Sequence, residues 1–366
     1  MEPTSLHIAF RSLHDPRINR KKRHSLLDII ILSVIAVLCG ADGYDDIAEF
    51  GKINIAFLKQ FLELKNGIPS HDTIRRVFML LQPKSFEKCF SKWAESIKKE
   101  GVIERVIAID GKTSRRTKDS FHHKTALHSL HAWSVENGIC LGQVACGEKS
   151  NEITAIPQML DLLNIKGSII TIDAMGTQRA IAEKIIDAGG DYILAVKGNQ
   201  GTLEEEVKTT CKRNRPVSDT TTIEKNHGRI ETRRCEVFAK GHIVDFDNVW
   251  KNLQSVIKIT ATREFANGKI ETFERFYISS LTSNSQNFNQ YIRDHWGVEN
   301  SLHWTLDMVF REDEQRKRAG HAAKNFAIVR KITLNLLKKD TEKDSMRRKR
   351  LKAAWNKDYL IKLLKF

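Results

Sequence analysis

The chain has 366 residues, 41% of them apolar, and is therefore long enough to bury a large core and to form two or three domains. Its formal net charge of +15 favours a polyanionic partner such as nucleic acid, although a basic protein without such a partner is the alternative. The six cysteines include no C-x-x-C pair, which speaks against a zinc ribbon and predicts reduced thiols in a cytosolic protein.

The basic residues Arg20–His24 and the apolar run Ile29–Cys39 together resemble a signal peptide. However, the run is shorter than the roughly 20 residues that a membrane span needs, and Asp28 lies at its edge. We therefore expect a buried helix here and no membrane partner.

Residues 1–100 are expected to form a helical domain that could bind DNA ends. The predicted helices cover residues 26–38, 45–50, 55–62, 72–81 and 85–97, with Ser70 and Ser85 as caps. The segment Ser70–Val77 resembles the second half of a helix-turn-helix, in which Arg75 and Arg76 would contact phosphates. An ordinary helix with solvated arginines is the alternative.

Residues 101–200 predict strands that alternate with helices. Strands are expected at 106–110, 128–135 and 139–146, in the apolar run that ends at Asp173, and at 192–196. Helices are expected at 153–163 and 177–188. The dipeptide Asn137-Gly138 predicts a tight hairpin. This order predicts an α/β fold with a mixed five-stranded sheet flanked by helices, as in the ribonuclease H-like fold. By analogy with that fold, the first and fourth strands are neighbours and bring Asp110 and Asp173 together.

Residues 201–282 are expected to form an inserted β-rich subdomain, with strands at 230–239, 254–263 and 272–280. The loops Val196–Gln200 and His227–Arg229 are short and basic. Their residues Lys197, Asn199 and Arg229 are candidate contacts to a phosphate backbone.

The third candidate acid lies on a predicted helix at 291–310, where steps of four align His295, Glu299, His303 and Asp307 beside apolar Val298, Leu302, Leu306 and Val309. A carboxylate at the edge of a buried face is costly unless it is paired or metal-bound. Two strand-end aspartates and Glu299 would suit Mg²⁺. A salt-bridged surface helix is the alternative, and a zinc site at His295 and His303 lacks the H-E-x-x-H order.

The remaining segment, 283–366, continues as helices with basic runs at Arg316–Arg318, Lys338-Lys339 and Arg347–Arg350. In most proteins such runs are solvated helix faces. Beside a DNA-acting site, we expect phosphate contacts that position DNA without reading its sequence.

Several motifs together resemble those of the H-repeat-associated transposases of bacterial insertion sequences. These motifs are Ala108–Thr113, Asn151–Pro157, Thr171–Gly176, Val196–Gln200 and His295–Trp304. The resemblance implies a ribonuclease H-like core with a β insertion before the glutamate. It also implies metal-dependent DNA cleavage and strand transfer by an Asp-Asp-Glu mechanism that uses two Mg²⁺ or Mn²⁺ ions.

The resemblance assigns catalysis and metal binding to Asp110, Asp173 and Glu299. The wider class carries a Tyr, Arg, Glu, Lys signature on the glutamate helix, from which this chain departs: His295 replaces the Arg, Tyr291 is one place early, and Leu306 replaces the Lys. We therefore expect Arg293, His303 or Asp307 to serve instead. The candidate DNA contacts around the site are Arg293, His295, His303 and Lys112, which lies beside the first aspartate.

By the same resemblance, the partners are double-stranded element ends and target DNA, bound by a homodimer in the synaptic complex, in the cytoplasm on the nucleoid. Two alternatives stay open: a catalytically silent DNA-binding remnant of a transposase, and another ribonuclease H-like nuclease such as a junction resolvase. Strand-transfer products would distinguish the transposase from both.

Overall fold

The computed structural model describes residues 4–19, 22–119, 121, 124–147, 152–226, 228–241 and 248–365. The chain divides into two compact units, of which the first contains residues 1–102, 111–150 and 299–366 and the second contains 103–110 and 151–298. The units cut across the four segments expected from sequence, because the N-terminal and C-terminal helices share one unit. Arg20, Lys21, Asn151 and His227, named above, lie outside the described residues.

The first unit is mainly helical. Its helices are α1 (Ser5–Phe10), α2 (Leu26–Leu38), α3 (Tyr44–Ile53), α4 (Ile55–Leu58), α5 (His71–Leu80), α6 (Pro83–Ser96), α11 (Trp304–Met308), α12 (Ala322–Lys339), α13 (Met346–Trp355) and α14 (Lys357–Leu364). Helix α2 has the predicted bounds, and its residues from Ile29 to Leu38 are all buried. The apolar run is therefore a core helix, and no helix among the described residues is long and apolar enough to cross a bilayer.

Two predicted helix starts have different outcomes. Ser70 caps α5 as predicted, since its side chain accepts a hydrogen bond from the amide of Thr73. Helix α6 begins at Pro83 and not after Ser85, because proline is favourable in the first turn, where its missing N–H is not needed.

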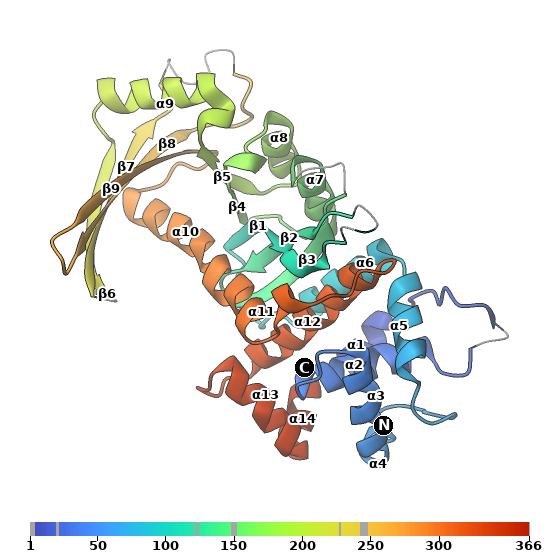
Figure 1. The fold of residues 1–366 in the computed structure, drawn as a ribbon. Coiled ribbons are helices and arrows are strands. Elements are labelled where there is room, and N and C mark those ends of the chain that lie inside the picture. Colours follow the sequence, from blue (N-terminus) through green and yellow to red (C-terminus); the bar gives the residue numbers. More distant parts are fainter. Residues whose placement is uncertain are drawn as a thin grey trace. The chain divides into compact units, whose positions relative to one another are not determined.

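Helix α12 forms the centre of the first unit. It packs against α2, α5, α6 and the strand β3 (Ile139–Ala145), as Figure 1 shows. Its residues from Asn325 to Leu337 are all buried, including the charged Arg330 and Lys331. A helix that is buried on every side offers no solvated basic face, so residues 325–337 form the packed part of the C-terminal segment, between the expected basic runs.

The predicted hairpin joins β2 (Leu127–Ser134) to β3, with Gly138 in the left-handed region at a φ of +66°. The amide side chain of Asn335, on α12, donates to the carbonyl of Cys140 and accepts from its amide, both at 2.8 Å. These bonds satisfy the backbone of β3, an edge strand of the sheet.

The second unit contains most of the sheet. Its elements are the first part of β1 (Val106–Ser114), α7 (Glu152–Leu162), β4 (Ile169–Ile172), α8 (Arg179–Asp187), β5 (Asp191–Val196), α9 (Gly201–Arg213), β6 (Ser218–Asn226), β7 (Arg229–Ala239), β8 (Ser255–Phe265), β9 (Ile270–Ser279) and α10 (Ser285–Val298). The sheet has nine strands in the order β3-β2-β1-β4-β5-β9-β8-β7-β6, so the predicted number of five is wrong.

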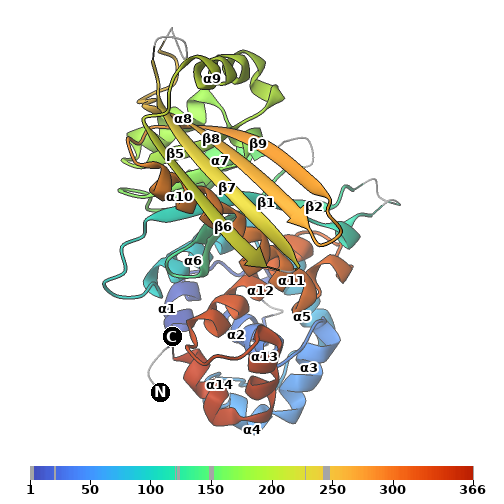
Figure 2. The ribbon, with the colours of Figure 1, turned by 90° about the vertical axis from the view of Figure 1, so that its left-hand side faces the viewer.

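The additional strands come from the insertion. Strand β9 pairs antiparallel with β5, so the four inserted strands extend the existing sheet and do not form a separate β subdomain. Figure 2 shows them side by side, with α10 packed on β6 and β7 and α9 near β9. Helix α9 and strand β6 were not expected from the sequence. Strand β6 is almost entirely polar, and the helical spacing of Leu203 and Val207 in α9 was overlooked among charged residues.

The helix predicted at 291–310 is present as far as Met308, but it is not one uniform α-helix. Helix α10 ends at Val298, a π-helical turn covers Glu299–His303, and α11 follows. A π turn closes i→i+5 hydrogen bonds, so the predicted stripe at steps of four is not continued past Glu299.

Candidate active site

The two candidate aspartates follow neighbouring parallel strands. Strand β1 pairs with β4 from Val106 opposite Ile169 to Ile109 opposite Ile172. One further residue on each strand leads to Asp110 and Asp173, so both carboxylates lie at the same end of the strand pair. The adjacency expected by fold analogy is therefore present, although β1 continues to Ser114 and does not end at Asp110.

The local structure after β4 fixes Asp173. Its carboxylate accepts a hydrogen bond from the amide of Met175, at 3.1 Å, and caps the short helical turn Ala174–Gly176. A Cβ atom at position 176 would lie 2.4 Å from a methyl group of Ile172, so only glycine fits this turn.

The pKa of the Asp173 carboxyl is raised, first by burial and then by the negative charge of Glu152, while the amides of Gly176 and Met175 and the charge of Lys197 act against this rise. A carboxylate whose charge is disfavoured in this way gains from a bound cation. Carboxylate oxygens such as those of Asp110 and Asp173 are the donor type that a divalent metal ion like Mg²⁺ takes, and the register of β1 and β4 puts both residues at the same end of the paired strands.

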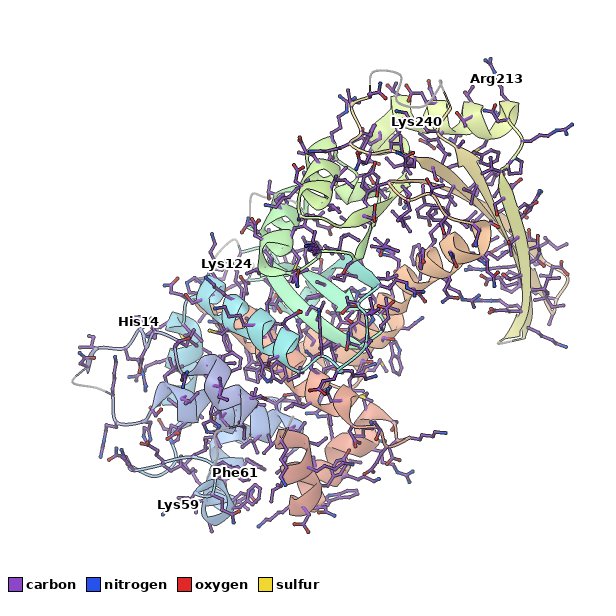
Figure 3. All side chains as sticks on the ribbon, turned by 180° about the vertical axis from the view of Figure 1, so that it is seen from behind. His14, Lys59, Phe61, Lys124, Arg213 and Lys240 are labelled. Atoms are coloured by element: carbon purple, nitrogen blue, oxygen red, sulfur yellow. The ribbon has the colours of Figure 1, made fainter. Side chains whose placement is uncertain are left out.

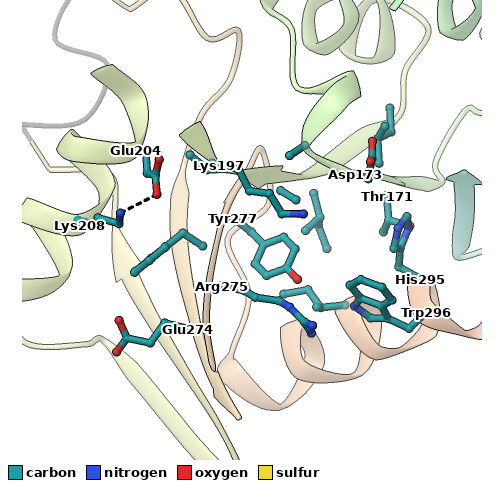
Figure 4. A pocket seen from close by; sticks show the side chains of 17 residues that line it. Thr171, Asp173, Lys197, Glu204, Lys208, Glu274, Arg275, Tyr277, His295 and Trp296 are labelled. Carbon is teal, nitrogen blue, oxygen red and sulfur yellow. Dashed lines mark hydrogen bonds and ion pairs between the residues drawn. The ribbon is translucent and has the colours of Figure 1, made fainter. Parts of the chain in front are cut away.

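A cavity of about 270 Å³ lies beside Asp173 in the second unit. The cavity is lined by Lys197, which follows β5, and by Arg275 and Tyr277 on β9. His295 and Trp296, from α10, also line it (Figure 4). The guanidinium of Arg275 stacks on the Trp296 ring at 4.7 Å. Arg275 and Tyr277 were missed in the sequence, although their two-residue spacing places them on one face of a strand and could have indicated them.

His295 is held inside this cavity and does not project toward solvent as a DNA contact would. Its Nδ1 atom is hydrogen bonded to Oγ1 of Thr171, on β4, at 2.9 Å. Burial lowers the pKa of the imidazole to about 4, so His295 is neutral at physiological pH. A neutral imidazole supplies no charge for a phosphate, so His295 does not replace the charge of the signature arginine at physiological pH. Its contact to DNA stays a prediction.

This environment gives a measurable expectation. In an NMR titration, the imidazole signals of His295 should not shift between pH 8 and about 5.5, because the folded-state pKa lies near 4. A midpoint near 6.5 for His295 would contradict the buried position of its ring.

Glu299 opens the π-helical turn and is exposed, while its neighbours Val298 and Leu302 are buried. It belongs to the first unit, whereas Asp110 and Asp173 belong to the second. Among the residues that the structure describes, no three His, Cys, Asp or Glu side chains form a ready metal-binding group.

Lys112 does not have the predicted DNA-facing position. The side chain is buried, and its ammonium lies 2.7 Å from Asp307, 3.3 Å from Asp313 and 3.6 Å from Glu312. Glu312 is itself buried beside Arg330 and Lys331 on α12, at 3.6 and 3.7 Å. We call these six residues the buried charge cluster. Since its acids neutralise Lys112, this lysine is not available to a phosphate.

Comparison with known proteins identifies the family. The sequence model described as "Transposase DDE domain" matches residues 103–336, and the one described as "DDE_Tnp_1-associated" matches residues 8–94. The "H repeat-associated putative transposase YhhI" of Escherichia coli (strain K12) is 43% identical over 361 residues, which cover 96% of this chain and 95% of that protein. The chain belongs to the DDE transposase family.

A second relative and one solved structure also align with the chain. The "Putative transposase YncI" of Escherichia coli O157:H7 is 42% identical to this transposase over 359 residues, covering 96% of this chain and 92% of that one. A cryo-EM structure of the piggyBac transposase synaptic complex with hairpin DNA aligns with 99% of this chain and 78% of its own, at 11% identity and a TM-score of 0.44. The structural similarity to the piggyBac transposase is therefore weak.

The other predicted DNA contacts of this transposase fall into two groups. Arg75, Arg76 and Lys197 are exposed, although Arg75 also lies 3.4 Å from Asp72. Asn199 and Arg293 are engaged within the protein: the Asn199 amide donates to the carbonyl of Ala174 at 2.6 Å, and Arg293 pairs with Glu224 on β6. Arg229 lies 3.6 Å from Glu231 on its own strand. His303 is hydrogen bonded to the buried His131, at 3.1 Å.

The C-terminal basic runs of the transposase are also divided. Arg316, Arg318, Arg347 and Arg348 are exposed. Lys349 is buried and donates to the carbonyl of Asp340 at 2.6 Å, and Arg350 donates to that of Val37 at 2.9 Å. The buried cations satisfy the ends of helices and contribute nothing to a DNA-binding surface.

Proposed function

We propose that this transposase binds the ends of its insertion sequence and catalyses metal-dependent DNA cleavage and strand transfer by an Asp-Asp-Glu mechanism. The observation that carries the proposal is the register of β1 and β4, which leads to Asp110 and Asp173 at one end of two neighbouring strands. Membership of the DDE transposase family supports the same assignment.

The sheet order supports a ribonuclease H-like core for the proposed enzyme. The first five strands are consecutive in the order β3-β2-β1-β4-β5. Strands β2 and β3 are antiparallel, whereas β1, β4 and β5 are parallel. This is the mixed arrangement expected from the strand and helix order of the sequence, and the insertion extends it at β5.

In the proposed mechanism, Asp110, Asp173 and Glu299 would hold two Mg²⁺ or Mn²⁺ ions. When bound, such ions supply charge neutralisation at the phosphate and activation of a water or a 3′-hydroxyl for in-line attack. Asp173 is kept in place by the amide of Met175, so its oxygens do not have to reorganise. Lys197 lies in the cavity beside Asp173 and adds positive charge for the DNA backbone.

The proposed substrates are double-stranded element ends and target DNA. The first step would be hydrolysis at an element end, and the second would be attack of the freed 3′-hydroxyl on target DNA. Bringing two ends together would require at least a dimer.

The test is cleavage of a labelled duplex that carries the end of the chain's own insertion sequence, with Mg²⁺, Mn²⁺ or EDTA, by the wild type and by Glu299→Gln. We expect cleavage at the end with either metal ion, none with EDTA, and none with the variant. Glu314→Gln, an exposed glutamate in the same unit, is the control and should cleave like the wild type. Binding without cleavage under every metal condition would support a catalytically silent DNA-binding protein instead.

A further inference from the structure

A second cavity, of about 340 Å³, lies within the first unit. One wall is the segment before β2, with Lys124, and the other is the segment that enters α12. Five lining residues are basic and none is acidic: Lys124, Lys317, Arg318, His321 and Lys324. We call it the basic cavity. A concave site with this lining attracts anions.

The wall that leads into α12 is anchored to the end of α5. Gly320 has a φ of +53°, and a Cβ atom there would lie 2.7 Å from the carbonyl oxygen of Met79. The same carbonyl accepts a hydrogen bond from the amide of His321 at 3.0 Å. The Asn325 side chain donates to the carbonyls of Phe78 and Leu81, both at 2.8 Å. Because the wall is fixed in advance, a ligand would pay little ordering entropy.

Not every cation of the basic cavity is available to a ligand. The ammonium of Lys317 donates to the carbonyl of Asp42 at 2.7 Å and lies over the ring of Phe326 at 4.1 Å. Burial lowers its pKa to about 7, so it carries only part of a charge at neutral pH. The pKa of His321 is lowered by burial and then by the charges of Lys324 and Lys124, so this ring is neutral.

Three cations remain. Neither Lys124 nor Lys324 forms an ion pair with a described residue, and Arg318 uses only its Nε atom, in a 3.4 Å bond to the carbonyl of Arg116. Lys324 is near the carboxyl of Glu87, but burial raises the pKa of that carboxyl to about 7, so it cancels only part of the lysine charge. Arg116 is exposed and extends the positive surface beyond the cavity.

We propose that the basic cavity binds a backbone phosphate of duplex DNA through Lys124, Arg318 and Lys324. The inference rests on the proposed function for its choice of ligand. The exposed Arg116 beside the cavity favours an extended polyanion over a free phosphate ion, because its charge would lie outside the reach of a single small anion. Such a contact would position DNA without reading its sequence.

The experiment compares the salt dependence of duplex binding, by fluorescence anisotropy in EDTA, for the wild type and for Lys124→Gln/Lys324→Gln. Each lost phosphate contact lowers the slope of log affinity against log salt by about 0.9, so we expect the slope to fall by about 1 if both lysines share one phosphate and about 2 if they do not. The control is Lys59→Gln/Lys357→Gln, which removes two exposed charges from the same unit; Figure 3 labels Lys59 and Lys124 at separate places. The control should keep the wild-type slope.

Wild-type slope and affinity in the cavity variant would overturn the inference, as would an equal loss in the control, which would indicate a general effect of net charge. Inorganic phosphate at millimolar concentration should compete weakly with the duplex for the wild type and not for the cavity variant. If the wild type cleaves DNA but the cavity variant keeps the wild-type slope, the role of the basic cavity in DNA binding would be refuted while the proposed function would not. If the slope falls in the cavity variant but the wild type cleaves DNA under no metal condition, the proposed catalytic activity would be refuted. DNA binding by the basic cavity would still be supported.

Discussion

Asp173→Asn is expected to lower the rate of metal-dependent cleavage by on the order of 10³-fold, because it removes a carboxylate oxygen charge from the proposed metal site. The stability of the folded protein should not decrease. The pKa of Asp173 is raised in the folded protein, by burial first and by Glu152 second, so its ionised form destabilises the fold. Replacing it by a neutral amide should leave the midpoint of thermal unfolding unchanged or raise it at pH 7.

The stability difference between the wild type and Asp173→Asn should depend on pH. With the folded-state pKa above the ordinary value of 3.8, the cost of the carboxylate is absent at low pH and grows as the pH rises through the raised pKa. The stability advantage of Asn should therefore be largest near neutral pH and shrink toward pH 3.8. Asp161→Asn, at an exposed position paired with Lys184, is the matched control for activity. Wild-type cleavage by Asp173→Asn would remove this residue from the site.

Glu312→Ala is expected to cost about 3 to 5 kcal/mol of the free energy of unfolding, which is typical when one partner of a buried ion pair is removed. The glutamate is buried and lies within 3.6 to 3.7 Å of Lys112, Arg330 and Lys331. Without it, Arg330 and Lys331 would remain buried and would lose the carboxylate that lies within 3.7 Å of both, although the charge of Asp42 would still act on Arg330. Lys112 would keep Asp307 and Asp313. Urea unfolding at pH 7 measures the difference.

Burial, the largest influence, acts to raise the pKa of Glu312, but Lys331, Arg330 and Lys112 together hold it below the ordinary value of 4.5. Its stabilising effect is therefore full above pH 4.5 and is lost as the pH falls through the lowered pKa. The wild type and Glu312→Ala should converge in acid. Glu314→Ala, which removes an exposed partner of Arg311, should unfold like the wild type. An equally stable Glu312→Ala would show that the cluster does not depend on this acid.

The positions of the first five strands along the chain, each candidate aspartate included, could be predicted because the signal is local. That the first and fourth strands are neighbours was expected only by fold analogy. The runs at Val106–Ile109 and Ile169–Ile172 are apolar and β-branched, and each is followed by an aspartate. Helix α2 was predicted to the residue for the same reason, since its apolar run begins just after the capping Ser25. The insertion was harder, because β6 is almost entirely polar and α9 shows its helical period at only two apolar residues, Leu203 and Val207.

The environment of single cations could not be predicted in this way. Lys112 meets acids that lie 195 to 201 positions later in the chain, and no spacing rule connects residues so far apart. Lys349 and Arg350 occur in a run with the exposed Arg347 and Arg348, and the sequence alone does not say which of the four turns inward. His295 has the same difficulty, since its partner Thr171 comes from a strand 124 residues earlier.

The π turn at Glu299–His303 holds one residue more than an α turn would. An α-helix rotates by about 100° per residue, so deleting that residue would turn everything downstream by more than a quarter of a circle. Asp307 would then leave Lys112, and the buried Leu306 would turn toward solvent. Reading frames of related elements that lack one codon here would therefore encode a smoother helix but a damaged core, and such copies should have lost transposition.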